Sequence, residues 1–216
     1  MHAGLSCYSD SINRVIQLGE KAGLDVNDFA KVFNRSSGVI LAKGMAILAR
    51  LGFGYLVKDS ILNKNKARQS ETFFDENFVI DDPNAKGGHR LYQGRFLIRT
   101  RKAKDDMNVL IRFCPDPDDM YLETPFGKAL NPASLVSTST LNESEAEEIA
   151  NNPDKVDLVI QFKDVESILG LIGREEVDIV GLLLENLVQL KGNVGHLFKL
   201  GAIAKNIELE LGLAKH

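Results

Sequence analysis

Cysteine is scarce in this sequence of 216 residues, and the net charge is small. The two cysteines, Cys7 and Cys114, lie too far apart for metal-ligand spacing, so we expect reduced thiols in a reducing compartment. The net charge of -4 provides no overall positive field, which argues against a nucleic-acid partner. The first residues, MHAGLSCYSDS, lack the charged and apolar regions of a secretory signal. Together these absences favour a cytoplasmic protein.

Motifs of common catalytic and metal sites are also missing. The sequence contains neither a GxSxG nucleophile elbow nor an HExxH zinc motif, and no glycine-rich nucleotide fingerprint follows a strand pattern. His196 stands at the start of an expected helix, but His2, His89 and His216 show no ligand spacing with it. We expect His196 to contact solvent or a loop carbonyl. The sequence therefore predicts no enzymatic activity, no cofactor and no metal.

Long apolar runs are rare, and the clearest one covers residues 39–57. It is nearly long enough to span a bilayer, but Lys43 and Arg50 interrupt it on one helical face. Gly52 and Gly54 weaken its end as a helix. We expect an amphipathic helix buried on one side, with contact at a membrane surface as the alternative and a membrane span as the least favoured reading.

The pattern of apolar residues divides the chain into a helical N-terminal region, 1–74, and a second domain, 75–216. The stretch DDPNAKGG at 81–88 is typical of a turn or linker. Strand-like alternation follows at 90–101 and 107–114, and MYLET at 120–124 is a third, short candidate. We expect these three segments to form an antiparallel meander with one face toward water.

The C-terminal part alternates between helix and strand patterns. Asn142 and Glu145 have the spacing of a capping box at the start of a short acidic helix, whose charges we expect to be solvated. The strand expected at 155–164 points Leu158, Ile160 and Phe162 inward. The remaining expected elements are a short helix at 165–173, an apolar helix at 176–187, a strand at 187–192 and a helix at 194–213 with Leu197, Leu200, Gly201, Ala204 and Ile207 along one side.

Two stretches carry a resemblance to a known family. VDLVIQFKDVESILGLIG (156–173) and LVQLKGNVGHLFKL (187–200) resemble the sterol carrier protein family of lipid-binding domains. In that family an acidic residue opens a short helix after a central strand and a glycine ends it, as Asp164 and Gly173 do here. The last strand of the family ends in a glycine-asparagine-apolar-glycine turn, which residues 192–195 match in order.

The resemblance covers about residues 78–213 through the order of the expected elements. The last helix begins with apolar residues and carries a lysine before a leucine, Lys199 and Leu200, whereas Asn186 stands where the family commonly has a glycine. The resemblance implies an α+β fold, in which helices cover a curved antiparallel sheet of about five strands and enclose an apolar tunnel. In the family this tunnel holds fatty acids, fatty acyl thioesters, sterols or phospholipids and does no chemistry.

The function that this resemblance implies is non-catalytic binding and transfer of a lipid or other apolar ligand, of the fatty acid, acyl thioester, sterol or isoprenoid type. Burial of each ligand CH2 contributes roughly 0.8 kcal/mol, so such a tunnel needs no catalytic group. A solid core made of the same side chains is the alternative. The predicted ligand-binding residues are Phe96, Ile98, Ile111, Phe113, Ile160, Leu169, Ile179, Leu183, Val194, Leu197 and Phe198.

A second resemblance concerns the N-terminal region. GEKAGLDVNDFAKVFNRSSG (19–38), within residues 9–60, is similar to the helical C-terminal domain of the β-hydroxyacid dehydrogenases. The helix that bears the catalytic lysine in that family would precede Met1, so a remnant without a cofactor domain is one alternative function. Another is an accessory lipid-presenting or oligomerising module of a pathway enzyme complex. The N-terminal helices would then dock a partner or form a homodimer.

A basic stretch offers a further surface. With few acids nearby in the sequence, it is a candidate for contact with anionic lipid head groups at a membrane surface. The alternative is a solvated outer face of the sheet. The stretch consists of Arg90, Arg95, Arg99, Arg101, Lys102 and Lys104.

Overall fold

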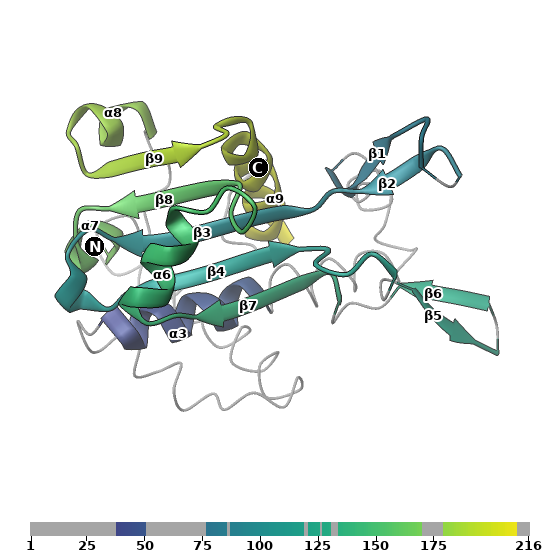
Figure 1. Ribbon diagram of the computed structural model, residues 1–216, viewed down its shortest axis with the longest axis horizontal. Helices are drawn as coiled ribbons and strands as arrows, with labels where there is room; N and C mark the ends of the chain where they lie inside the picture. The colour runs from purple at the N-terminus through teal and green to yellow at the C-terminus, as the bar shows by residue number, and fades with distance from the viewer. Residues whose placement is uncertain are drawn as a thin grey trace, which may run out of the picture.

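A five-stranded sheet forms the centre of the computed structural model (Figure 1). The structure describes residues 38–50, 77–85, 87–118, 121–125, 127–130, 134–169 and 179–210. The sheet has the order β7-β4-β3-β8-β9. Its strands are β3 (Gly94–Thr100), β4 (Asn108–Phe113), β7 (Val136–Thr140), β8 (Leu158–Phe162) and β9 (Val188–Gly192). With helices on both sides of this sheet, the expected α+β class is confirmed.

The described helices are α3 (Gly38–Ala49), α6 (Glu143–Ala150), α7 (Val165–Leu169), α8 (Ile179–Leu184) and α9 (Gly195–Glu210), with a 3-10 turn, η2, at Ala103–Asp105. Two antiparallel hairpins complete the described elements. They are β1 (Val79–Asp81) with β2 (His89–Leu91), and β5 (Tyr121–Thr124) with β6 (Gly127–Leu130). Both hairpins project from one end of the central sheet in Figure 1.

One strand pair of the central sheet is parallel, which differs from the antiparallel sheet expected from the resemblance. β3 and β8 run in the same direction, with Phe96 opposite Leu158, and the other three pairs are antiparallel. Parallel neighbours require a crossover connection. Here the chain makes an antiparallel meander through β4 and β7, crosses the sheet through α6 and returns as β8 on the free side of β3. The sheet is therefore mixed.

The third strand of the meander is not the one expected. Residues 121–124 form β5, which pairs with β6, and the strand next to β4 is β7. The sequence of β7, VSTST, is rich in β-branched residues but has a single large apolar side chain, and β7 lies at the sheet edge. An edge strand that is buried only at Val136 gives no strong apolar alternation, and the sequence pattern therefore pointed to the wrong segment.

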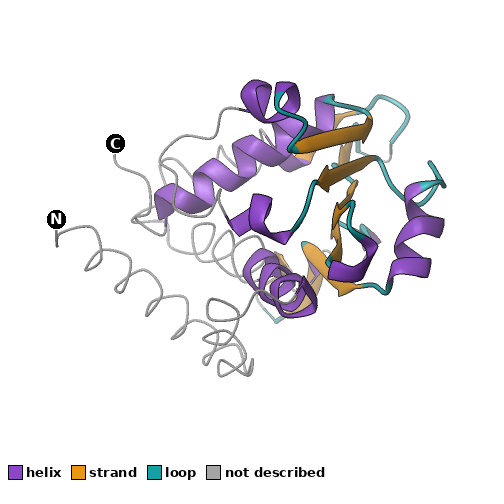
Figure 2. Cartoon of the chain, turned by 90° about the vertical axis from the view of Figure 1, so that its left-hand side faces the viewer, coloured by secondary structure: helices purple, strands orange, loops and turns teal. Residues whose placement is uncertain are grey.

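The larger core lies on one face of the sheet, and the predicted strand alternation is confirmed there. Phe96 and Ile98 of β3 join the same core as alternate apolar residues of the neighbouring strands, which are Val109, Ile111 and Phe113 of β4 and Leu158 and Ile160 of β8. Helices α3, α7 and α9 cover this face, which we call the main core face (Figure 2). The described part of the 39–57 run packs here, because Leu41 and Ala46 are buried, while Lys43 and Arg50 are exposed as expected for an amphipathic helix.

The opposite face is less open to water than expected. Leu97 and Leu110 are buried beneath Ala146 and Ala150 of α6. The capping box at the start of α6 is confirmed, because the Asn142 side chain accepts a hydrogen bond from the Glu145 amide and the Glu145 side chain accepts one from the Asn142 amide. The cap fixes where α6 begins and thus which of its residues meet the sheet.

Several expectations fall outside the residues that the structure describes. They include the resemblance at 9–60 apart from its α3 portion, the N-terminal docking or homodimer surface, the domain boundary at 74/75, and the positions Cys7 and Gly173. A separate finding concerns membranes. Among the described residues, no helix has the length and apolar character that a membrane span requires.

Candidate functional site

The predicted ligand-binding residues divide into two groups in the structure. One group lies inside the main core face, where its side chains contact each other and the covering helices. Its members are Phe96, Ile98, Ile111, Phe113 and Ile160, all buried, with Leu197 packed against them and partly buried. Edge-on contact between the Phe96 and Phe113 rings, 5.7 Å apart, shows how closely this group packs. These residues belong to one packed hydrophobic cluster.

The second group is exposed. Phe198 on α9 is 75% exposed, and Leu183 and Val194 are exposed as well. Sequence reasoning missed two neighbours on α8, Val180 and Leu184, which are 65% and 82% exposed. The side chains of Leu169 and Ile179 lie outside the described residues. Helices α8 and α9 and the turn before α9 thus carry apolar side chains that do not pack into the described core.

Helix α9 presents only part of the expected side to the sheet, because Leu197 and Leu200 pack against the core but the covered side is turned toward Ile203. Ile203 is fully buried, whereas Gly201, on the expected side, is exposed. The side chains of Ala204 and Ile207 are not described. The positions that lie toward the sheet, buried or partly buried, are His196, Leu197, Lys199, Leu200 and Ile203. A histidine and a lysine therefore share the covered side of this helix, because residues three apart are neighbours on a helix surface.

The turn between β9 and α9 determines which side of α9 faces the sheet. Gly192 has a φ of 117°, and a Cβ added to it would lie 2.3 Å from the carbonyl oxygen of Asp157. The Asn193 amide donates to the same oxygen at 3.0 Å, and the Asn193 side chain accepts from the Gly195 amide at 2.9 Å. These contacts confirm the predicted strand-to-helix turn and explain the first of its two glycines.

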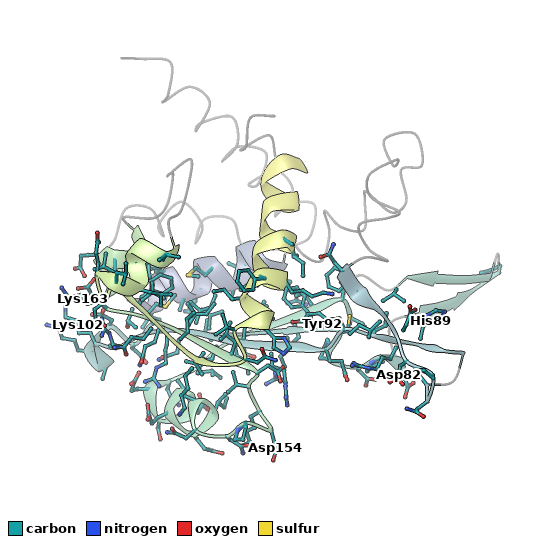
Figure 3. All side chains as sticks on the ribbon, turned by 90° about the horizontal axis from the view of Figure 1, so that it is seen from above. Asp82, His89, Tyr92, Lys102, Asp154 and Lys163 are labelled. Atoms are coloured by element: carbon teal, nitrogen blue, oxygen red, sulfur yellow. The ribbon has the colours of Figure 1, made fainter. Side chains whose placement is uncertain are left out.

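Tyr92 lies beside the start of α9, as its label in Figure 3 shows. Its side chain is buried, and its ring covers Gly94, where an added Cβ would lie 2.6 Å from the phenol oxygen. The Tyr92 hydroxyl is hydrogen-bonded to Nδ1 of His196 at 2.5 Å, and the two rings stack with centroids 5.5 Å apart. The Nζ atom of Lys199 lies 4.9 Å from the centre of the Tyr92 ring. We call these three residues the Tyr92–His196–Lys199 cluster.

Sequence reasoning missed this cluster. It predicted that His196 would contact solvent or a loop carbonyl, but the imidazole binds Tyr92, which lies 104 positions earlier in the chain. Such a contact depends on the placement of β3 beside α9 and leaves no local pattern. The one available signal was the glycine two positions after Tyr92, because a glycine in a strand often marks a close approach by another group.

Burial sets the electrostatics of the cluster. It raises the pKa of Tyr92 well above its ordinary value, with the Asp157 charge adding to the effect, so the phenol stays neutral. Burial also lowers the pKa of Lys199. Among the described residues, no carboxylate lies within ion-pair distance of Lys199. The Lys199 ammonium group is therefore partly desolvated. Among the described residues it contacts the Tyr92 ring but has no countercharge.

Asp157, the acid whose charge acts on Tyr92, is already engaged. Arg95 donates to Asp157 from Nη2 at 2.6 Å and from Nε at 3.0 Å, a bidentate pair. Burial acts to raise the pKa of Asp157, but the hydrogen bonds and charge of Arg95 outweigh it and lower the pKa overall. Asp157 therefore stays ionised and neutralises Arg95 rather than Lys199.

The basic stretch does not form one open surface. Arg99 is 3% exposed and binds Glu143 and Glu147 of α6, two charges that were expected to be solvated only. Arg95 is paired with Asp157, and Arg90 lies 3.2 Å from a carboxylate oxygen of Asp82. Arg101 donates to the side chain and carbonyl of Asn186. Lys102 lies 4.0 Å from a carboxylate oxygen of Asp105, and Lys104 faces solvent beyond the far end of β3.

Two surface hollows are lined mainly by residues with charged or amide side chains. One, of about 640 Å³, lies near Lys102 and Lys163, whose labels are together in Figure 3. The other, of about 210 Å³, lies beside α6 and β9. Neither is lined by a predicted ligand-binding residue. The described residues contain no group of three or more His, Cys, Asp or Glu side chains able to hold a metal ion.

Comparison of the chain with family models, with curated proteins and with solved structures found no match. The interpretation of the site therefore depends on its own geometry and on the resemblance of the sequence.

Proposed function

We propose that this protein binds and transfers a lipid or other apolar ligand in the cytoplasm, without catalysing a reaction. The observation that carries the proposal is the exposed apolar surface of α8 and α9, above all Phe198 and Leu184. Helix α8 alone carries three exposed apolar side chains, those of Val180, Leu183 and Leu184, and apolar side chains that cluster in this way mark binding surfaces more often than scattered single ones. These helices flank β9 at its two ends and border the main core face (Figure 1).

The order of elements supports the proposal. After the meander, the described chain continues through β8, α7, α8, β9 and α9, which is the order that the resemblance to sterol carrier proteins requires. Asp164 accepts hydrogen bonds from the Ser167 amide at 2.8 Å and hydroxyl at 2.6 Å, which suits an acidic residue that opens a helix.

The departure at Asn186 also has a physical reason. Asn186 has a φ of 55°, in the left-handed region that glycine adopts freely and that asparagine tolerates better than most residues. Asparagine is therefore a suitable residue at a place where the family commonly has a glycine.

The packing narrows where the ligand would lie. Phe96, Ile111 and Phe113 are buried against one another, and no ligand would pass between them without moving the core. Leu197 and Leu200 are only partly buried at the edge of this core. We therefore place the proposed ligand along the rim of the main core face, between α9 and the exposed side chains of α8. Each ligand methylene buried there contributes about 0.8 kcal/mol.

Native mass spectrometry of the gently purified full chain tests this proposal, together with displacement of a fluorescent fatty acid probe. We expect a protein mass with a bound small molecule, and probe binding weakened several-fold by Phe198→Ser. Val39→Ser is the matched control, because Val39 is an exposed apolar residue on α3 and is not a predicted ligand contact. A bare protein mass combined with no probe binding would refute the proposal.

A further inference from the structure

Lys199 is an unusual residue for its place in the fold. It lies on the covered side of α9, between His196 and the fully buried Ile203, where an apolar residue would complete the packing. Its described neighbours include no carboxylate at ion-pair distance, and the Tyr92 ring 4.9 Å away gives only partial compensation for lost hydration. A desolvated cation is costly unless an opposite charge accompanies it.

The other members of the cluster supply hydrogen-bond donors but no negative charge. The buried Tyr92 phenol is neutral and contacts Nδ1 of His196. When Tyr92 donates this hydrogen bond, the imidazole carries its proton on Nε2, which then acts as a donor. His196 and Lys199 are one helical turn apart on the same side of α9, and both side chains contact the Tyr92 ring.

The surrounding charges leave this region positive. Asp157, the acid whose charge acts on Tyr92, is held by the bidentate contact with Arg95, so the Lys199 ammonium group is left without a countercharge among the described residues. A carboxylate suits one cation and a second donor, because each of its two oxygens can accept one of these hydrogen bonds. A phosphate dianion would need more positive charge than Lys199 provides.

We infer that Lys199 and His196 bind the carboxylate of a fatty-acid-type ligand, whose chain then lies along the apolar rim described for the proposed function. This inference depends on that function and adds the class of ligand. Tyr92 is a positioning residue, since its ring covers Gly94 and its hydroxyl orients the imidazole. The ligand supplies the countercharge that the described protein lacks around Lys199.

Probe displacement by dodecanoate and by dodecanol tests the inference, because the two share a chain and differ in the head group. At pH 8 we expect the full chain to prefer the acid by about tenfold, a typical contribution of one charge-assisted hydrogen bond. Lys199→Met should remove this preference while dodecanol binding stays within about twofold. Lys104→Met is the matched control, because Lys104 is an exposed lysine beyond the opposite end of β3.

The outcomes separate this inference from the proposed function. Equal affinity of the wild-type protein for dodecanoate and dodecanol overturns the carboxylate site and leaves apolar binding intact. A preference for dodecanoate that is unchanged in Lys199→Met has the same consequence. Binding of neither molecule overturns both proposals. Should Lys199→Met fail to fold, carbon NMR of carboxyl-labelled dodecanoate on the wild-type protein decides the matter. An ion pair with Lys199 lowers the carboxyl pKa below that of the free acid, and an unchanged or raised value counts against it.

Discussion

Replacing Gly192 by alanine tests the close packing of the turn that launches α9. At a φ of 117°, any residue other than glycine is strained, at a cost of about 2 kcal/mol. The new Cβ would lie 2.3 Å from the Asp157 carbonyl oxygen, so the backbone must move apart. This movement breaks the 3.0 Å hydrogen bond from the Asn193 amide to that oxygen, which costs about 1 kcal/mol more. We therefore expect Gly192→Ala to lower the free energy of unfolding by about 3 kcal/mol.

Urea unfolding followed by circular dichroism at neutral pH measures this change. Gly201→Ala is the matched control, since Gly201 is exposed within α9 and an added Cβ there meets nothing within 4 Å. Because alanine is the better helix former, this control should raise the free energy of unfolding by about 0.8 kcal/mol. The reasoning is refuted when Gly192→Ala unfolds within about 0.5 kcal/mol of the wild-type protein.

Two further predictions concern titratable groups. Asp157→Asn should destabilise the protein by about 2 kcal/mol at pH 7. Because the folded state lowers the pKa of Asp157, its stabilising contribution is complete above the pKa of the unfolded state and is lost as the pH falls through the pKa of the folded state. Urea unfolding near pH 3 should therefore show a smaller difference in stability between wild type and variant than at pH 7, and an equal difference would contradict the ion pair with Arg95. Cys114 is buried, and burial raises its pKa to about 12. In a Cys7→Ser background, a disulfide reagent at pH 8 should therefore label Cys114 slowly in the native protein and rapidly in urea. Fast labelling of the native protein would instead show that the thiol is accessible.

Local patterns in the sequence predicted the parts of the fold that depend on neighbours in the chain. The alternation in β3, β4 and β8 marks the main core face, since side chains on a strand point to opposite faces in turn. The capping box of Asn142 and Glu145 and the glycine turn after β9 are equally local, and both are found in the structure. Each of these features needs only a few consecutive residues to be recognised.

Features that depend on distant parts of the chain could not be predicted in this way. The parallel pairing of β3 with β8 follows from the crossover through α6, which the strand patterns do not encode. Arg99 looked like one of several surface cations, but the position of α6 over the sheet brings Glu143 and Glu147 to it. The partnership of Tyr92 with His196 likewise requires the finished sheet and the rotation of α9 about its own axis.

For the candidate site, the sequence did not distinguish the apolar side chains that are buried in the core from those that are exposed. Phe96 and Phe113 were predicted as ligand contacts, and both are buried in the core. Phe198 was predicted on the same grounds and is exposed. Hydrophobicity alone does not distinguish a side chain that is buried in a core from one that is exposed at a binding surface, because both are apolar and both follow the same helical or strand period.

The crossover that places β8 beside β3 also has a consequence for how the chain acquires its structure. β3 and β4 are consecutive strands and pair as soon as both are synthesised, but the other edge of β3 stays unpaired until residues 158–162 are available. During that interval an apolar strand that ends up in the middle of the sheet behaves as a bare edge, open to pairing with another chain. An internal strand of the finished sheet is thus an open edge until the chain has been made through β7, α6 and β8.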